Sequence, residues 1–129
     1  MKKWYFYPSI LTLNLYGLVN SQEKSRNAFF SKNIPDDELK EYSEKLCSES
    51  FLAFMKMLFP RIKVNNHLKI PMLVIGGKND KLFSHKDHEQ TARKYKAELI
   101  MADNISHDMM LDLNHDKVSE LMINWLHKN

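Results

Sequence analysis

One short apolar run constrains the fold of this chain more than any other segment. Residues Met72–Ile75 are apolar at four consecutive positions, and Gly76 and Gly77 follow at once. A strand with one solvated face would alternate apolar and polar residues, whereas a strand in a parallel sheet is covered by helices on both faces. The run therefore predicts a strand over residues 70–75, buried on both faces, in an α/β protein.

The residues that follow predict a second strand beside the first. A capping-box pattern at Ser84–Asp87 predicts a helix to about residue 96, and residues 97–101 predict another short strand. Asp112 or Asn114 then opens a last helix. Its apolar residues recur with helical spacing; they are Val118, Leu121, Met122, Trp125 and Leu126. Strand–helix–strand–helix at this spacing indicates a crossover between parallel strands.

The first part of the chain predicts helices only, so we divide the chain into residues 1–66 and 67–129. Helices are expected over residues 8–16 and 22–30, and another begins at Pro35, where three acidic residues suit the positive end of a helix dipole. A further apolar helix over residues 51–59 ends at Pro60.

Composition excludes several classes of function. The net charge is +3, from 19 basic and 16 acidic residues, and no concentrated basic segment is present, so nucleic-acid binding is not expected. The 3 glycines form no phosphate-binding loop. The single cysteine, Cys47, excludes an internal disulfide and is expected to be buried and inert, late in the helix that starts at Pro35.

The N-terminal segment leaves two interpretations of location open. Residues 4–19 carry no charge and follow two lysines, which is compatible with a signal peptide over residues 1–21 and an exported protein. The same sixteen residues are short for a membrane span, so no stable span is expected. The alternative is a cytoplasmic protein in which this apolar segment belongs to the folded structure.

Two polar residues follow the two predicted strands. Asp80 lies in the loop after the first strand and His107 in the loop after the second, 27 residues later. Function in α/β sheets gathers beyond the carboxyl ends of the strands, so the two side chains are expected to meet. A carboxylate there would fix the tautomer of the imidazole and stabilise the imidazolium. Taken singly, Asp80 is also a typical turn residue and His107 a typical loop histidine.

Two segments carry a resemblance to a known family. The segment PMLVIGGKNDKLF (71–83) ends a strand in Gly-Gly-x-x-Asp, and SHDMMLD (106–112) is a histidine loop before an amphipathic helix. Together they resemble the C-terminal third of the α/β-hydrolase fold. Residues 28–50 resemble the helical cap that many such hydrolases insert before this strand. The resemblance implies a partial α/β-hydrolase fold, with a helical cap or lid over residues 1–66 and core over residues 67–129.

The resemblance also implies a chemistry. It makes Asp80 the acid and His107 the general base of a Ser-Asp-His triad in an esterase or lipase-like enzyme that hydrolyses a small acyl ester without a cofactor. It favours a cytoplasmic location over export. Asp103 and Asp112 are weaker alternatives to Asp80, and Asp108 is too close in sequence to orient the base. Ser106 stands where the family usually has glycine before the histidine.

The family's nucleophile is missing from the sequence. That serine lies in Gly-x-Ser-x-Gly, and glycine occurs here only at positions 17, 76 and 77. The chain therefore resembles a truncated, C-terminal half of a hydrolase that is inactive alone. We expect it to be marginally stable, to form homo-oligomers or to need a complementary polypeptide.

Two further interpretations compete with the hydrolase. The apolar helices over residues 34–59 could instead make the chain a non-catalytic module that binds a protein or lipid surface. His85 and His88 have the spacing to share one helix face beside Glu89, but no third ligand with metal-binding spacing follows, so no metal site is expected.

Overall fold

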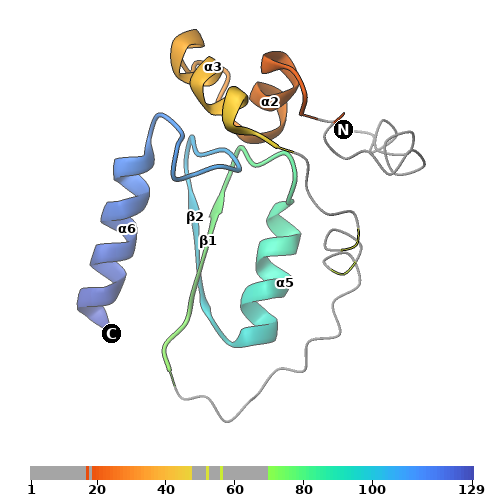
Figure 1. Cartoon of the computed structure of the whole chain (residues 1–129). Helices are drawn as coiled ribbons and strands as arrows, with labels where there is room; N and C mark the ends of the chain where they lie inside the picture. The colour runs from red at the N-terminus through yellow and green to blue at the C-terminus, as the bar shows by residue number, and fades with distance from the viewer. Residues whose placement is uncertain (1–16, 18, 48–51, 53–55, 57–69) are drawn as a thin grey trace. The chain divides into compact units, whose positions relative to one another are not determined.

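The computed structural model describes residue 17, residues 19–47, residues 52 and 56, and residues 70–129. The elements in chain order are α2 (Gln22–Phe29), α3 (Asp36–Lys45), β1 (Leu73–Gly77), α5 (His85–Tyr95), β2 (Glu98–Ala102) and α6 (His115–Lys128) (Figure 1). The helix expected over residues 8–16 lies outside the described residues. So does the helix expected over residues 51–59, apart from residues 52 and 56.

The chain divides into two compact units that do not coincide with a single cut in the sequence. One unit comprises Met1–Arg26 and Pro35–Ile62, and the other comprises Asn27–Ile34 and Lys63–Asn129. The short segment 27–34 therefore belongs with the part of the chain that contains the sheet.

In the first unit, α3 begins where its sequence predicts, at Pro35, but it ends earlier than expected, at Lys45. Pro35 is the N-cap residue and three acidic residues occupy the first turn. Leu39 is buried, and its carbonyl accepts a hydrogen bond from Ser43 Oγ, which also lies 3.1 Å from Ser25 Oγ. The predicted burial of Cys47 in this helix is wrong, because α3 ends at Lys45 and the thiol is exposed beyond it.

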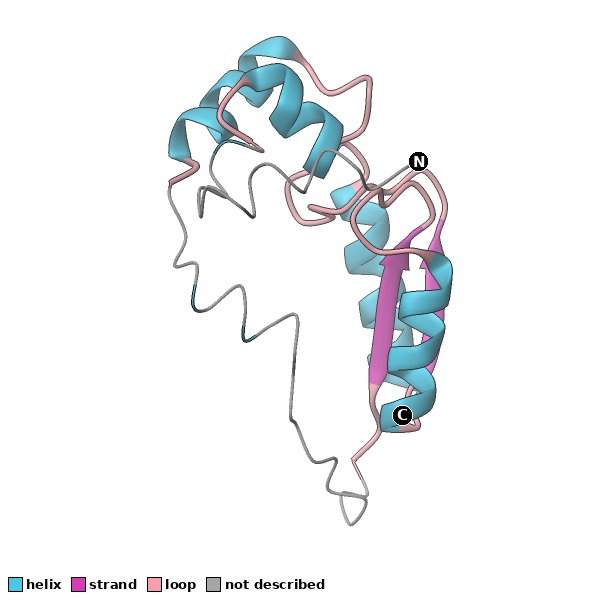
Figure 2. Cartoon of the chain, turned by 90° about the vertical axis from the view of Figure 1, so that its right-hand side faces the viewer, coloured by secondary structure: helices cyan, strands magenta, loops and turns pink. Residues whose placement is uncertain are grey.

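In the second unit, β1 and β2 form a two-stranded parallel sheet. The register runs from Leu73 opposite Glu98 to Gly77 opposite Ala102. Helices α5 and α6 lie on opposite sides of this sheet (Figures 1 and 2). The described residues thus confirm the predicted strand–helix–strand–helix order and the parallel pairing of a mixed α/β arrangement.

Local signals set the bounds of α5. The Ser84 side chain accepts a hydrogen bond from Asp87 N, and the Asp87 carboxylate accepts one from Ser84 N, which confirms the predicted capping box. At the other end Lys96 adopts a left-handed conformation with φ 53°, so the chain leaves the helix and Ala97 N donates to the Ala92 carbonyl.

The core of the second unit is small. Ala102, Ile105 and Val118 are buried, and Ile75, Met109 and Leu121 pack against them. The prediction that the first strand is buried on both faces is wrong, because Leu73–Ile75 are only partly buried. Met122 and Leu126 of α6, which share the apolar spacing of that helix, are 47% and 61% exposed. The reason is that, within the described residues, each strand has one partner, so the sheet is too narrow to cover both helices.

No helix in the described parts of the chain is both long and apolar enough to cross a lipid bilayer.

Candidate acid–base site

The loops that follow the two strands are joined to one another. Lys78 N donates to the Ala102 carbonyl and Asn79 N donates to the Ile105 carbonyl, each at 2.9 Å. The Lys78 ammonium also lies 2.7 Å from an Asp103 carboxylate oxygen and lowers the pKa of that acid. Because β1 and β2 are parallel neighbours, their carboxyl ends meet at one edge, and these bonds extend the pairing past the last strand residues.

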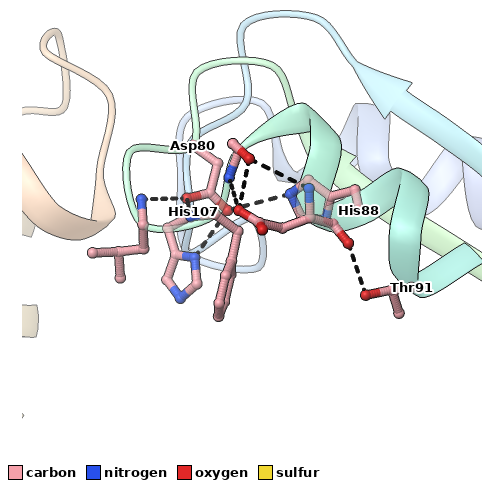
Figure 3. Close-up of polar contacts among 8 residues, drawn as sticks. Asp80, His88, Thr91 and His107 are labelled. Carbon is pink, nitrogen blue, oxygen red and sulfur yellow. Dashed lines mark hydrogen bonds and ion pairs between the residues drawn. The ribbon is translucent and has the colours of Figure 1, made fainter. Parts of the chain in front are cut away.

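Asp80 and His107 meet above this edge. Asp80 Oδ2 lies 3.0 Å from His107 Nδ1, although the residues are 27 positions apart (Figure 3). The Asp80 side chain is 2% exposed and the His107 side chain is 27% exposed. The predicted proximity of the two side chains is therefore confirmed, with the acid buried and the imidazole reachable from solvent.

The other oxygen of Asp80 is held by the backbone. Asp80 Oδ1 accepts hydrogen bonds from Leu82 N at 2.8 Å and Phe83 N at 2.9 Å. Asp80 is thus also the turn residue that its sequence context suggested. Burial acts to raise the pKa of Asp80, but the hydrogen bonds from His107, Phe83 and Leu82 outweigh burial and leave that pKa below its ordinary value. The acid is therefore a carboxylate at neutral pH.

The His107 ring lies against two aromatic rings. The ring centroid of Phe83 is 5.3 Å from that of His107, and the centroid of Phe29 is 5.9 Å away. Phe29 is held near this loop because its carbonyl accepts a hydrogen bond from Asp108 N at 2.9 Å. With Nδ1 donating to Asp80, the neutral ring carries its lone pair on Nε2, which is the nitrogen available to take a proton.

The alternative acids have other partners. Asp103 pairs with Lys78 as described, and Asp112 is fully buried in a separate network. The Asp112 carboxylate accepts hydrogen bonds from Ser31 N, Ser31 Oγ, Ser106 N and Leu113 N, at 2.7 to 3.1 Å. Asp112 therefore fixes the loop that carries His107 and does not bind its imidazole. Sequence reasoning missed this role because Ser31 lies 81 residues away.

A second histidine approaches the acid. His88 Nε2, on α5, lies 3.7 Å from Asp80 Oδ2, the oxygen that binds His107 (Figure 3). His85, which could have shared a metal with His88, instead faces Glu89, with 3.3 Å between Nε2 and Oε1. In the described ranges no three histidine, cysteine, aspartate or glutamate side chains are grouped to hold a metal ion. The sequence indicated His88 only through its spacing from His85.

This arrangement supports proton transfer but holds no nucleophile of its own. Across the part of the chain that is described, no serine, threonine or cysteine side chain hydrogen-bonds to His107. What these residues provide is an oriented imidazole with a free Nε2 and an adjacent buried carboxylate. Comparisons with models of known protein families, with curated proteins and with solved structures give no match to this chain.

Proposed function

We propose that this chain supplies the acid and base of a serine hydrolase of the α/β-hydrolase type, which hydrolyses acyl esters. Asp80 orients the imidazole and His107 is the general base. The observation that supports the proposal is the hydrogen bond between Asp80 Oδ2 and His107 Nδ1 at the carboxyl ends of two adjacent parallel strands. The order of the two residues in the chain, acid before base, is the order of that fold.

In this function His107 moves a proton at Nε2. The base takes the proton from a serine hydroxyl as the oxygen attacks the ester carbonyl, and then gives it to the departing alcohol oxygen. The Asp80 carboxylate, which is buried and anionic, stabilises the imidazolium that exists between the two steps. General-base assistance of this kind contributes roughly 10²–10⁴-fold to the rate.

The nucleophile of this proposal lies outside the 129 residues. With glycine only at positions 17, 76 and 77, the sequence holds no Gly-x-Ser-x-Gly, so a complementary polypeptide would supply the serine and the oxyanion donors. We therefore expect no stoichiometric labelling when the chain alone is incubated with a fluorophosphonate. Labelling of a serine in this chain would overturn the assignment.

Complementation gives the positive test. The DNA upstream of this reading frame is searched for a frame that encodes Gly-x-Ser-x-Gly, and its product is co-expressed with this chain and assayed on p-nitrophenyl esters. His107→Ala should lower kcat by about 10²–10⁴-fold in the complemented enzyme. His115→Ala is the matched control, since His115 is a half-exposed histidine at the start of α6 that bonds within its own turn.

The second candidate is a non-catalytic module that binds a protein or lipid surface through the helices of residues 34–59. It is supported by the apolar pattern of that segment in the sequence; Leu52, one of its described residues, is 70% exposed. Binding that survives His107→Ala, together with a failure to find any complementing hydrolase half, would favour this candidate over the first.

A further inference from the structure

The Asp80 carboxylate is approached by two imidazoles, of which the proposed chemistry uses only one. His88 lies near the start of α5, and its ring faces Asp80 beside His107 (Figure 3). A Cβ on residue 76 would lie 2.7 Å from both Cγ and Cδ2 of this ring, so the glycine at that position makes room for His88. The His88 ring can therefore lie beside the end of β1 because residue 76 has no side chain.

The ring nitrogen Nε2 of His88 is buried at a position where it needs a hydrogen-bond partner. Nε2 is buried and, among the described residues, has no hydrogen-bond partner. The carboxylates on its own helix are engaged elsewhere: Asp87 accepts from Ser84 N and Oγ, and Glu89 faces His85. Asp80 Oδ2, 3.7 Å away, is the acceptor that Nε2 faces.

The strands bring no competing charge to His88. Strand β1 carries no titratable residue, and the acid of β2, Glu98, lies at the opposite end of the sheet, where it accepts a hydrogen bond from Trp125 Nε1. In the loop after β1, Lys78 pairs with Asp103, while Phe83 presents its ring at 75° to the His88 ring. The electrostatic environment of Nε2 is therefore set by Asp80.

This environment selects one tautomer of His88. An unprotonated Nε2 would direct its lone pair at the lone pairs of a carboxylate oxygen, which is repulsive, whereas a protonated Nε2 directs an N–H at them. Asp80 Oδ1 is already occupied by two backbone N–H groups, and Oδ2 can accept from two donors. The distance between His88 Nε2 and Asp80 Oδ2 is 3.7 Å, and a small inward movement of the His88 ring would shorten it to that of a hydrogen bond.

We propose that His88 is a positioning residue, which presents Nε2–H to Asp80 Oδ2 and so holds that oxygen toward His107. Two imidazoles and two backbone N–H groups then fix the carboxylate at both oxygens, and the carboxylate cannot turn away from the base. The proposal deepens the proposed function because it names what orients the acid. Its readouts below need neither a serine nor an ester, so it fails or stands independently of the hydrolase activity.

The first test reads the tautomer directly in the unaltered chain. The full 129-residue chain is labelled with ¹⁵N, and two-bond ¹H–¹⁵N spectra assign which nitrogen of neutral His88 carries the proton. We expect the proton on Nε2 of His88 and on Nδ1 of His107. A proton on Nδ1 of neutral His88 would overturn the proposal, because Nε2 would then have no hydrogen to donate.

The second test distinguishes a hydrogen-bond donor role of His88 from a role in packing alone. His88→Phe keeps a ring on Gly76 but removes the N–H, and His88→Gln keeps an N–H near the position of Nε2. The pKa of Asp80, followed through its carboxyl carbon by NMR, should rise by roughly one unit in His88→Phe, because a donor to the charged form is lost. His88→Gln should restore most of the difference.

The matched control is His85→Gln, one turn away on the same helix, where His85 faces Glu89. This change should leave the pKa of Asp80 at the wild-type value. An unchanged pKa of Asp80 in His88→Phe would contradict the positioning role. Equal shifts of that pKa in His88→Phe and His88→Gln would contradict it too, and His88 would then serve packing alone.

Discussion

The carbonyl oxygen of Ile105 lies 2.3 Å from the point that a Cβ on Gly77 would occupy. No side chain fits in that space, so the loop after β2 can cross the end of β1 only at a glycine. The crossing is also where Asn79 N bonds to Ile105. The Gly-Gly pair therefore brings together the two loops that carry Asp80 and His107.

The first prediction concerns this crossing. Gly77→Ala should push the Ile105 backbone away and lower the free energy of unfolding by about 1–3 kcal/mol, as overpacking does. Urea denaturation measures the loss, and the hydrogen-bonded Nδ1–H proton signal of His107 should disappear with it. In Gly76→Ala the added methyl meets the His88 side chain instead of backbone, so this variant should perturb His88 while the Asn79–Ile105 bond persists.

The second prediction concerns the buried Asp112. Asp112→Asn replaces one acceptor oxygen with an NH₂ group that faces donors, so a buried N–H would be left unpaired. We expect a loss of about 1–3 kcal/mol in the free energy of unfolding, measured by chemical denaturation. Asp116→Asn is the control, because that carboxyl group is 91% exposed and lies 3.3 Å from His115 Nε2. Equal stability of the two variants would refute the structural role assigned to Asp112.

The third prediction follows from the lowered pKa of Asp80. Because the folded chain holds this pKa below its ordinary value of 3.8, the carboxylate stabilises the fold at pH values above that figure. The stabilisation is lost as the pH falls from 3.8 through the lower pKa that Asp80 has in the folded state. Wild type should therefore exceed Asp80→Asn in the free energy of unfolding at pH 6, and the difference should shrink below about pH 4. A constant difference across this range would count against the pairing of a charged Asp80.

The fourth prediction concerns the start of α5, which places His88. Ser84→Ala removes the side chain that accepts from Asp87 N and should cost about 1 kcal/mol in stability. Thermal denaturation followed by circular dichroism measures this loss. Ser119→Ala is the control, since the exposed Ser119 hydroxyl donates to the His115 carbonyl within α6, and that change should leave the midpoint nearly unaltered.

The meeting of Asp80 and His107 was predictable, because it depends on strand periodicity and chain order alone. An unbroken apolar run predicts a strand, a capping box predicts the next helix, and parallel neighbours bring their ends to one edge. The register that results, with Gly77 opposite Ala102, places the two loops side by side. The location of the pair did not require any knowledge of the remaining chain.

The parts that could not be predicted depend on long-range packing. The direction in which His88 points is set by how α5 lies across β1, which the sequence of α5 does not encode locally. The role of Asp112 depends on Ser31, which sequence patterns link to no particular strand or loop. Met122 and Leu126 follow the helical pattern of a buried face but are exposed, because periodicity shows which residues share a face and not whether the sheet is wide enough to cover them.

The bonds between Ser31 and Asp112 span 81 residues, and they close the largest loop among the side-chain contacts described above. Bringing such distant segments together carries a large entropic cost that nearby contacts do not share. The loop that carries His107 should therefore acquire its native geometry late in folding and lose it early under denaturant. In hydrogen exchange, the Ser106 amide should open before the amides of α5, even though both belong to the same compact unit.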